Sequence, residues 1–532
     1  MKKHTLKHYY IHNYMGRLSL YYLVLLAYLF ISFIIPILIS SFIDSSIEAR
    51  QIFNFNLLFL ALFCVAEMIF SSTKDELNIR LSNKISFHIE YFIADHIKHS
   101  DYEQIKKYDD AYLAQRINND AVIVGDYICE KFPYFITDIC SIIFILLYLT
   151  YIDWMLGCIF IGGTIIYILS YVITNKYLFK LAEKMFDAQA SFFAMLSDQF
   201  NSILLIKINS WYEEKNKEFK EIVGKFYIHS LRYLRLEFIR KDGGMFFCRI
   251  LMILAMCEIG INILNGNSSI GMMTSLVLYT EIIVSKLNSA NSFGDSYQKY
   301  KLANKRLSEL RSYDLEKNGE QQLTHIDHIE LKNVSYNVGN RELIYPDVRF
   351  IKGNIYVLKG ENGSGKSTLT NLLLGILHCS KGETTYNGTK ISDINMNVMR
   401  RNIIAVKNQT PYIIDGNLKR NILFGNEKSI PSTIQNFINK FLDFSKTRGG
   451  WNMNIMHRNT ELSGGEQQRI AISRALCKDG DFLILDEPTN GLDDVAKYDL
   501  LSALDNMKDK IVLVITHDEC FDKIADEILQ LE

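Results

Sequence analysis

A glycine-rich loop with one lysine is the first candidate for chemistry in this sequence. The stretch at residues 360–368, "GENGSGKST", matches the pattern GxxxxGK[ST] and lies between a strand-like segment, "GNIYVLKG", and a helix-like run, "LTNLLLGIL". There the glycines let backbone N–H groups point at α- and β-phosphates, Lys366 reaches the β- and γ-phosphates, and the Ser367 hydroxyl ligates Mg²⁺. The predicted ATP-binding residues of this loop are Gly360, Glu361, Asn362, Gly363, Ser364, Gly365, Lys366, Ser367 and Thr368.

Two carboxylates follow a buried-strand pattern in "FLILDEPTNGLD". Asp486 is placed to hold Mg²⁺, and Glu487 is placed to orient and deprotonate an attacking water. The alternative is a pair of surface carboxylates before a proline turn. His517 ends another apolar strand, "IVLVITHD", where it can reach the γ-phosphate or the same water. Because open α/β sheets bind ligands at the carboxyl ends of their strands, we expect these groups to converge on one crevice.

A second anion-binding pattern occurs at residues 461–476, "ELSGGEQQRIAISRAL". Two glycines open a helix there, which leaves backbone N–H groups and the positive end of the helix dipole free for a phosphate. Ser463, Gly464 and Gly465 are therefore predicted to bind phosphate, although Ser463 could simply cap the helix.

The composition divides the chain into a membrane part and a soluble part. The 532 residues carry 58 Lys and Arg against 59 Asp and Glu, and this balance gives no reason to expect a nucleic-acid partner. Six apolar runs approach the roughly 20 helical residues that span a bilayer. One such run could be a buried core helix, but six in series indicate a membrane domain. The predicted spans are 18–43, 52–70, 133–152, 154–174, 243–264 and 270–287.

The connections between the spans alternate in length and charge. The short connections hold only Arg50 as a basic residue, whereas the two long ones, 74–131 and 176–241, are dense in Lys and Arg. Positive charge marks the cytoplasmic side, so both termini and both long connections of this multi-pass protein are predicted to be cytoplasmic. Each long connection favours a helical hairpin, with turns near 99–110 and 207–219 that are either solvated or dock on another domain.

The predicted fold class is a membrane all-α domain of six helices with long cytosolic helical extensions, followed by an α/β P-loop nucleotide-binding domain. The membrane domain is expected at residues 1–312, a polar linker at 313–324 and the nucleotide-binding domain at 325–532.

Taken together, the motifs resemble those of the ATP-binding cassette (ABC) transporters, specifically a half-size exporter of the type IV fold. "GENGSGKST" resembles the Walker A loop, "FLILDE" the Walker B strand with its catalytic glutamate, and "LSGGE" the family signature. The resemblance implies that Gln409 is the lid glutamine that contacts Mg²⁺ and the membrane domain, that Asp493 lies in a loop across a dimer interface, and that His517 is the switch histidine. It also implies that the turns around Tyr102 and Trp211 are coupling helices.

The resemblance implies an ATPase coupled to transmembrane transport that acts in the cell membrane as a homodimer. Each of two ATP sites would then combine Lys366, Gln409, Glu487 and His517 of one chain with the signature of the other, with ATP and Mg²⁺ bound. A small ribosomal peptide such as a bacteriocin is the expected substrate. A multidrug or lipid exporter, a subunit of a heterodimer and an ATP-gated protein that does not pump are the alternatives.

Three features depart from the family or remain open. Val338 stands where family members stack adenine on an aromatic ring, unless Tyr336 substitutes. The segment before the signature, "NIMHRNTE", lacks the usual glycine and glutamate pattern. Charged residues within the spans are expected to face the bundle interior, where they either line a polar path or pair between helices. They are Asp138, Arg249, Glu258 and Glu281.

Overall fold

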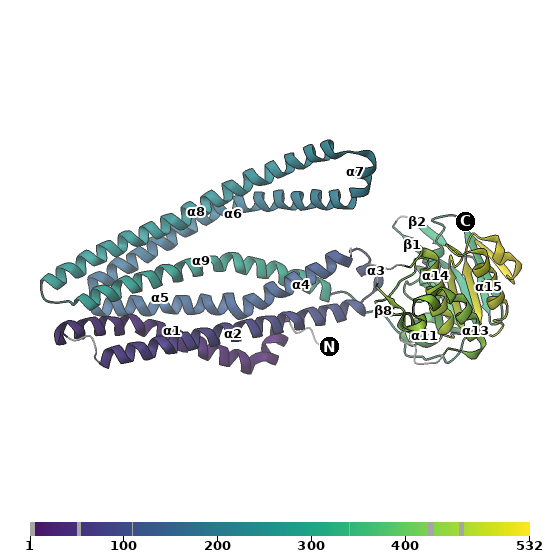
Figure 1. The fold of residues 1–532 in the computed structure, drawn as a ribbon, viewed down its shortest axis with the longest axis horizontal. Coiled ribbons are helices and arrows are strands. Elements are labelled where there is room, and N and C mark those ends of the chain that lie inside the picture. Colours follow the sequence, from purple (N-terminus) through teal and green to yellow (C-terminus); the bar gives the residue numbers. More distant parts are fainter. Residues whose placement is uncertain are drawn as a thin grey trace. The chain divides into compact units, whose positions relative to one another are not determined.

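A computed structural model of the chain describes residues 6–50, 55–108, 110–339, 341–423, 430–456 and 462–531. The chain forms two compact units (Figure 1). The first comprises Met1–Ile97 and Asp109–Ser312, and the second comprises Lys98–Tyr108 and Tyr313–Glu532. The short segment Lys98–Tyr108 therefore belongs with the C-terminal unit although it connects two helices of the first.

The first unit is a bundle of long helices. Each of six helical stretches in the described residues contains a segment long and apolar enough to cross a membrane, as predicted. Residues 52–54 of the predicted second span lie outside the described residues. The helices are α1 (Leu6–Ala49), α2 (Phe55–Lys98), α4 (Asp110–Asp126), which continues through a π-helical turn (Tyr127–Lys131) into α5 (Phe132–Ile152), α6 (Trp154–Asn201), α8 (Tyr212–Leu264) and α9 (Ile270–Arg311).

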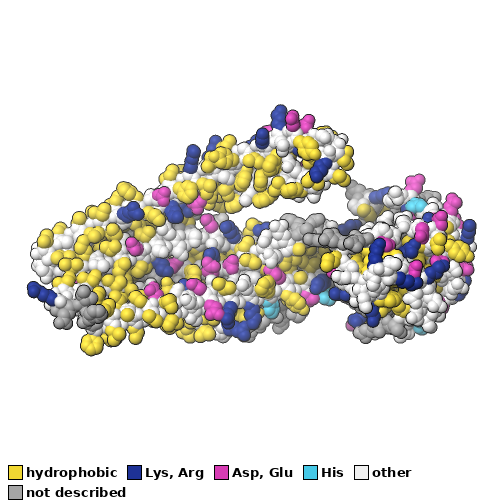
Figure 2. Space-filling view, viewed as in Figure 1, with side chains coloured by type: hydrophobic (Ala, Val, Ile, Leu, Met, Phe, Trp, Pro, Cys, Tyr) yellow, Lys and Arg dark blue, Asp and Glu magenta, His cyan; other side chains and the backbone are white. Residues whose placement is uncertain are grey.

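Apolar residues of the first unit lie both in its core and on its surface. Ile145, Phe160 and Tyr279 are buried where α5, α6, α8 and α9 pack together. Other large apolar side chains, such as Leu62 and Ile166, are exposed. Figure 2 shows such side chains covering much of this unit. An apolar exterior on helices with internally paired backbones is the arrangement that a lipid bilayer requires.

The helix ends of the first unit follow from local capping. Asp153 separates α5 from α6 with an extended backbone, and its side chain accepts a hydrogen bond from the Met155 N–H at 2.8 Å. Ser269 caps α9 in the same way through Met272 at 3.1 Å. Membrane helices can therefore follow one another with very short connections.

The two long connections turn at short helices. Helix α3 (Tyr102–Ile105) lies within the predicted turn at 99–110, and α7 (Ile203–Asn209) forms the second turn. The link between α7 and α8, Ser210 and Trp211, lies within the predicted stretch 207–219, and the rest of that stretch is helical because α8 begins at Tyr212. Ser210 adopts a left-handed backbone (φ +56°) that ends α7. Acidic residues in the first turn of α8 then favour an immediate restart of helix.

The second unit contains two main sheets. A parallel sheet has the order β12-β4-β11-β10-β7, and an antiparallel sheet has the order β2-β1-β5-β6 with β3 also paired to β1. The parallel strands are β4 (Ile355–Gly360), β7 (Ile404–Lys407), β10 (Phe482–Asp486), β11 (Ile511–Ile515) and β12 (Glu527–Leu531). The antiparallel strands are β1 (His328–Val338), β2 (Arg341–Ile344), β3 (Val348–Ile351), β5 (Lys381–Tyr386) and β6 (Thr389–Lys390).

Helices complete this unit. They are α10 (Lys366–Leu373), α11 (Met396–Asn402), α12 (Leu418–Leu423), α13 (Ser432–Phe441), α14 (Gly464–Cys477) and α15 (Asp494–Asp505). All five residues of β11 are buried, as expected for a parallel strand covered on both faces. Strands β4, β10 and β11 end at the same edge of the sheet because they are parallel neighbours. That edge carries the predicted catalytic residues.

Candidate functional site

The glycine-rich loop connects β4 to α10. Gly363 (φ +90°) and Gly365 (φ +97°) take left-handed backbone conformations that glycine adopts without strain. A Cβ atom on Gly365 would lie only 2.8 Å from the Tyr345 hydroxyl and 2.9 Å from a Leu343 methyl group. The sequence pattern is therefore required both by the turn and by its close approach to β2, and it places the N-terminus of α10 beside the loop.

Lys366 lies between this loop and His517. Its Nζ donates to the carbonyl oxygen atoms of Gly360 at 2.5 Å and Glu361 at 3.0 Å, and it lies 3.2 Å from Nε2 of His517. The predicted phosphate-binding lysine and the predicted switch histidine thus meet at the ends of β4 and β11.

Glu487 joins the same group. Its Oε1 lies 4.0 Å from Nε2 of His517, and its Oε2 lies 3.4 Å from the Thr516 hydroxyl. The carboxylate is mostly shielded from solvent, whereas His517 is more than half exposed. Lys366, Glu487 and His517 therefore lie close together at one edge of the sheet.

Asp486 is less exposed to water than an ordinary surface aspartate. Burial raises its pKa, while Lys407 and Lys366 act in the opposite direction. None of the sequence motifs identified Lys407 as a residue that contacts this site. Burial lowers the pKa of Lys407 to about 8, and its Nζ donates to the backbone carbonyl groups of Asp486 and Glu487. A lysine at the carboxyl end of an apolar strand, "IIAVK", is the signal that could have identified it.

Several features of the P-loop and of the neighbouring sheet edge suit a nucleotide with Mg²⁺. The Ser364 hydroxyl is buried without a hydrogen-bond partner among the described residues, so it is free to donate to a phosphate oxygen. Ser367 and Gln409 are exposed, and their oxygen atoms are ligands that Mg²⁺ prefers. Within the described residues, no group of three His, Cys, Asp or Glu could hold a metal by itself. The donor set therefore fits a metal that also takes phosphate oxygen atoms.

The signature forms the first turn of α14. Ser463 forms a capping box with Glu466: its Oγ accepts from the Glu466 N–H at 3.3 Å, and its own N–H donates to Oε2 of Glu466 at 2.7 Å. A Cβ atom on Gly465 would lie 2.3 Å from the Gly491 carbonyl oxygen, so Gly465 packs against the turn that precedes α15. Residues 457–461 of "NIMHRNTE" lie outside the described part of the chain.

Asp493 lies in that neighbouring turn. Its Oδ1 accepts from the Ala496 N–H at 3.0 Å, which caps α15, and from Nη2 of Arg469 at 2.8 Å. The cap and the guanidinium lower the pKa of Asp493. Arg469 lies on α14, so the signature helix and Asp493 form one local assembly.

The β1–β2 hairpin contains Val338 and Tyr336, the two residues considered above for stacking on adenine. Val338 is half exposed and pairs with Arg341 across the hairpin, and Nη1 of Arg341 lies 3.4 Å from the Gly363 carbonyl oxygen. The Tyr336 hydroxyl instead donates to Glu103 of α3, a contact within the second unit. Tyr336 is therefore engaged with the short helix.

Helix α3 is tied to the second unit by its backbone as well. The Asp101 N–H donates to the Asp314 carbonyl at 2.9 Å, and the Glu316 N–H donates to the His99 carbonyl at 2.8 Å. These bonds explain why the segment Lys98–Tyr108 belongs to the nucleotide-binding unit, which the span pattern did not reveal.

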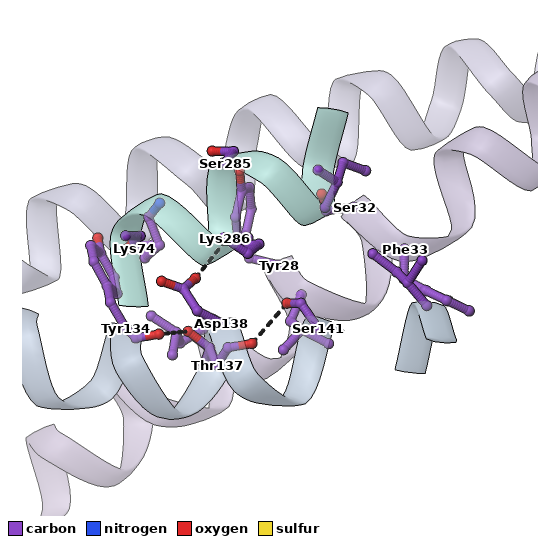
Figure 3. Close-up of a pocket in the computed structure, with 15 residues that line it drawn as sticks. Tyr28, Ser32, Phe33, Lys74, Tyr134, Thr137, Asp138, Ser141, Ser285 and Lys286 are labelled. Atoms are coloured by element: carbon purple, nitrogen blue, oxygen red, sulfur yellow. Dashed lines mark hydrogen bonds and ion pairs between the residues drawn. The ribbon is translucent and has the colours of Figure 1, made fainter. Parts of the chain in front are cut away.

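The first unit holds a cavity of about 190 Å³ between α1, α2, α5 and α9, lined by both polar and apolar side chains (Figure 3). Asp138 is buried, and its Oδ1 lies 2.9 Å from Nζ of Lys286 on a neighbouring helix. Lys74 lies 4.3 Å from the centre of the Tyr28 ring. Asp138 thus pairs between helices, which is one of the two expected alternatives.

The other charged residues of the spans lie elsewhere. Arg249 and Glu281 are exposed and line a hollow of about 460 Å³ between α8 and α9, and Glu258 is partly buried. No ion pair joins Arg249 to Glu281 among the described residues, so both charges are available to another group.

Known proteins share this architecture. The family model for the ABC transporter matches residues 346–490, and the model for the ABC transporter transmembrane region matches residues 18–287. A bacterial Atm1-family ABC exporter, solved with ATP bound, has a TM-score of 0.77 at 17% identity, over 98% of this chain and 94% of that one. At this level of identity, the structural likeness shows that the two chains share a fold.

Two curated relatives extend the comparison. A protein of Rickettsia bellii (strain RML369-C), whose name describes an export ATP-binding/permease protein, is 28% identical over 492 residues, or 88% of this chain and 80% of the relative. The lactococcin-G-processing and transport ATP-binding protein of Lactococcus lactis subsp. lactis is 27% identical over 350 residues, or 61% of this chain and 47% of that relative. Because the match to the transmembrane region alone covers more than half of the 532 residues, the chain belongs to the ABC transporter family and is a multi-pass membrane ATPase coupled to export.

Proposed function

We propose that two copies of this chain form an ATP-driven exporter in the cell membrane and that its substrate is a small ribosomally made peptide such as a bacteriocin. The observation that carries the two-copy assembly is the position of the signature. The hydrogen bonds of Ser463 involve residues of α14, whereas those of Lys366 involve the P-loop, α10 and His517. One chain thus offers two half-sites that its own contacts do not join.

Within one half-site, the P-loop amides and Lys366 bind the phosphate groups of ATP. Ser367, Gln409 and Asp486 supply oxygen ligands to Mg²⁺, which when bound neutralises charge on the phosphate oxygens. Glu487 orients the attacking water and accepts its proton, and His517 donates a hydrogen bond to the γ-phosphate. Their convergence at one sheet edge supports these roles.

The second copy completes the site. Its Ser463 hydroxyl and the amides of Gly464 and Gly465 contact the γ-phosphate, where the positive end of α14 favours negative charge. Its Asp493 lies across the interface beside the same nucleotide. The capping box supports this role because it fixes the first turn of α14 and leaves the glycine amides at its end.

The tip of the second long connection supports an association between copies. Leu204 and Ile208 of α7 are about two-thirds exposed, and Trp211 is also exposed. Adjacent apolar side chains on a cytosolic tip indicate a docking surface. We infer that α7 rests on the nucleotide-binding unit of the other copy, while α3, around Tyr102, is already joined to its own.

In the proposed cycle, ATP binding closes the two nucleotide-binding units and the coupling helices transmit this movement to the spans. The spans change from inward-facing to outward-facing, and hydrolysis resets them. Both termini and the nucleotide-binding units lie on the cytoplasmic side, in accord with the basic residues of the long connections.

Two observations bear on the class of substrate. The relative named for lactococcin-G processing and transport supports a peptide. A cavity with a charged pair, Asp138 and Lys286, would also suit the polar group of a drug or lipid. Stimulation of ATPase activity in nanodiscs by small peptides, and not by drugs or lipids, is the expected result; stimulation by lipids or drugs alone would favour those alternatives.

The shared site is tested by Ser463→Arg. A bulky cation at the start of α14 should leave ATP binding to Lys366 of the same chain within about threefold of wild type, yet abolish closure and reduce hydrolysis by about a hundredfold or more. ATP affinity and turnover are measured on the purified full-length protein. Full ATPase activity in this variant would refute the shared-site assignment.

A further inference from the structure

Lys407 is a buried cation next to the catalytic strand. It ends β7, and only 1% of its surface is exposed. In the parallel pairing of β7 with β10, Lys407 lies opposite Leu485, one residue before Asp486. Because a lysine is almost never fully buried unless its charge is compensated, this position calls for a specific partner.

The partners of Lys407 are two consecutive backbone carbonyl groups. Its Nζ donates to the Asp486 carbonyl oxygen at 2.6 Å and to the Glu487 carbonyl oxygen at 2.9 Å. These carbonyls lie where β10 ends and the chain turns away from the sheet. Lys407 therefore binds the carbonyl groups of the two peptide bonds that flank the Cα atom of Glu487.

The backbone of Glu487 needs such support. Its φ of +46° lies in the left-handed region, which is unfavourable for residues other than glycine and persists only when the surroundings impose it. The Glu487 N–H donates to the Ile515 carbonyl at 2.8 Å, and its own carbonyl accepts from Lys407. Strand β11 and Lys407 together hold both backbone polar groups of the residue Glu487.

We propose that Lys407 is a positioning residue for ATP hydrolysis. By holding the two carbonyl groups it maintains the left-handed turn that directs the Glu487 carboxylate toward His517 and Lys366. Lys407 acts through Glu487 and, being buried, does not contact the nucleotide. This inference rests on the proposed role of Glu487 as the base.

The test compares Lys407→Met and Lys407→Gln in the full-length protein in nanodiscs. Methionine preserves an unbranched side chain but has no donor, whereas glutamine retains an N–H donor for one carbonyl. We expect kcat to fall by about tenfold or more in Lys407→Met and by less in Lys407→Gln, with the KM for ATP within about threefold of wild type. A loss confined to kcat is expected because the P-loop contacts are unchanged.

Lys478 offers a matched control. It follows α14, and its Nζ donates to the backbone carbonyl of Arg400, away from the catalytic carboxylates. Lys478→Met removes an equivalent lysine-to-carbonyl bond, so it should lower Tm without lowering kcat. If Lys407→Met fails to bind ATP, kcat is compared between Lys407→Gln and Lys478→Met. A lower kcat in Lys407→Gln supports the proposal, and an equal kcat contradicts it.

Two results would overturn the proposal. One is wild-type kcat in both Lys407 variants, and the other is an equal loss of kcat in Lys478→Met, which would indicate general destabilisation. Measuring Glu487→Gln in parallel separates the two hypotheses. Normal turnover in Glu487→Gln refutes its role as the base, whereas abolished turnover there together with normal turnover in Lys407→Met refutes this inference alone.

Discussion

At the scale of single residues, the site depends on backbone conformations that are otherwise unfavourable. Glu487 has φ +46°, a left-handed conformation that costs about 1–2 kcal/mol for a residue with a Cβ atom. Gly363 and Gly365 take left-handed conformations at little cost because they lack a Cβ atom. Glycine thus occupies the left-handed positions of the loop that we propose binds phosphate, while the turn at Glu487, the proposed base, carries the strain of a non-glycine residue.

Replacing Glu487 with Gln tests the base directly. The amide has the same shape but accepts no proton, so hydrolysis should fall by about 10²- to 10⁴-fold. ATP affinity should remain close to wild type because the P-loop hydrogen bonds do not involve Glu487. Turnover and ATP binding are measured on the same preparation.

Glu519 provides the control for that substitution. It is exposed and lies two residues after His517 in sequence. Glu519→Gln should retain turnover, and normal turnover in Glu487→Gln would contradict the assigned role.

At the scale of elements, two short helices have different surroundings. Helix α3 is bonded to its own nucleotide-binding unit through Asp101, Glu103 and His99. Helix α7 instead presents exposed Leu204 and Ile208. The same position in two hairpins therefore has two kinds of surface, one bonded within the chain and one exposed, which we propose docks on a second copy.

Charge placed on α7 should uncouple transport from hydrolysis. Leu204→Glu or Ile208→Glu would bury a carboxylate in the proposed interface, at a cost of about 2 kcal/mol or more. We expect substrate-stimulated ATPase activity and transport to be lost, while ATP affinity stays unchanged. Ile228→Glu, on an exposed position of α8 beyond the tip, is the matched control and should retain stimulation. Retained stimulation in the α7 variants would argue against docking.

At the scale of the whole molecule, the chain combines one membrane unit and one nucleotide-binding unit, with one P-loop and one signature. If each ATP site combines a P-loop and a signature from different copies, as proposed, two complete ATP sites require two chains. In such a dimer, each site depends on Lys366 from one copy and Ser463 from the other, and this predicts complementation between two inactive variants.

Mixing Lys366→Ala chains with Ser463→Arg chains should restore activity that neither has alone. A mixed dimer has one intact site, formed by Lys366 of the second variant and Ser463 of the first. Random pairing makes about half of the dimers mixed, so about a quarter of wild-type ATPase activity is expected if the sites act independently. Coexpression with two affinity tags isolates the mixed dimers, and their complete inactivity would count against shared sites.

The sequence by itself determined the fold class and predicted that Lys366, Glu487 and His517 lie together. Span length and the strand–loop–helix context of "GENGSGKST" are local patterns, and the parallel strands before Asp486 and His517 end at one sheet edge because of their pairing. Such features depend on residues that are near each other in sequence or on regular strand geometry.

Only the tertiary structure decided which distant residues meet. Lys407 reaches carbonyl groups 79 and 80 residues away, Glu103 binds Tyr336, and Asp138 pairs with Lys286. The pattern "IIAVK" marks Lys407 as a lysine at a strand end, but no local pattern names the partner in any of these contacts, because each depends on how separate elements pack. The end of α7 was likewise set by the backbone of Ser210 and not by composition. The sequence pattern thus predicts the helices and strands and the residues at their ends. Tertiary packing determines which distant residues contact those ends.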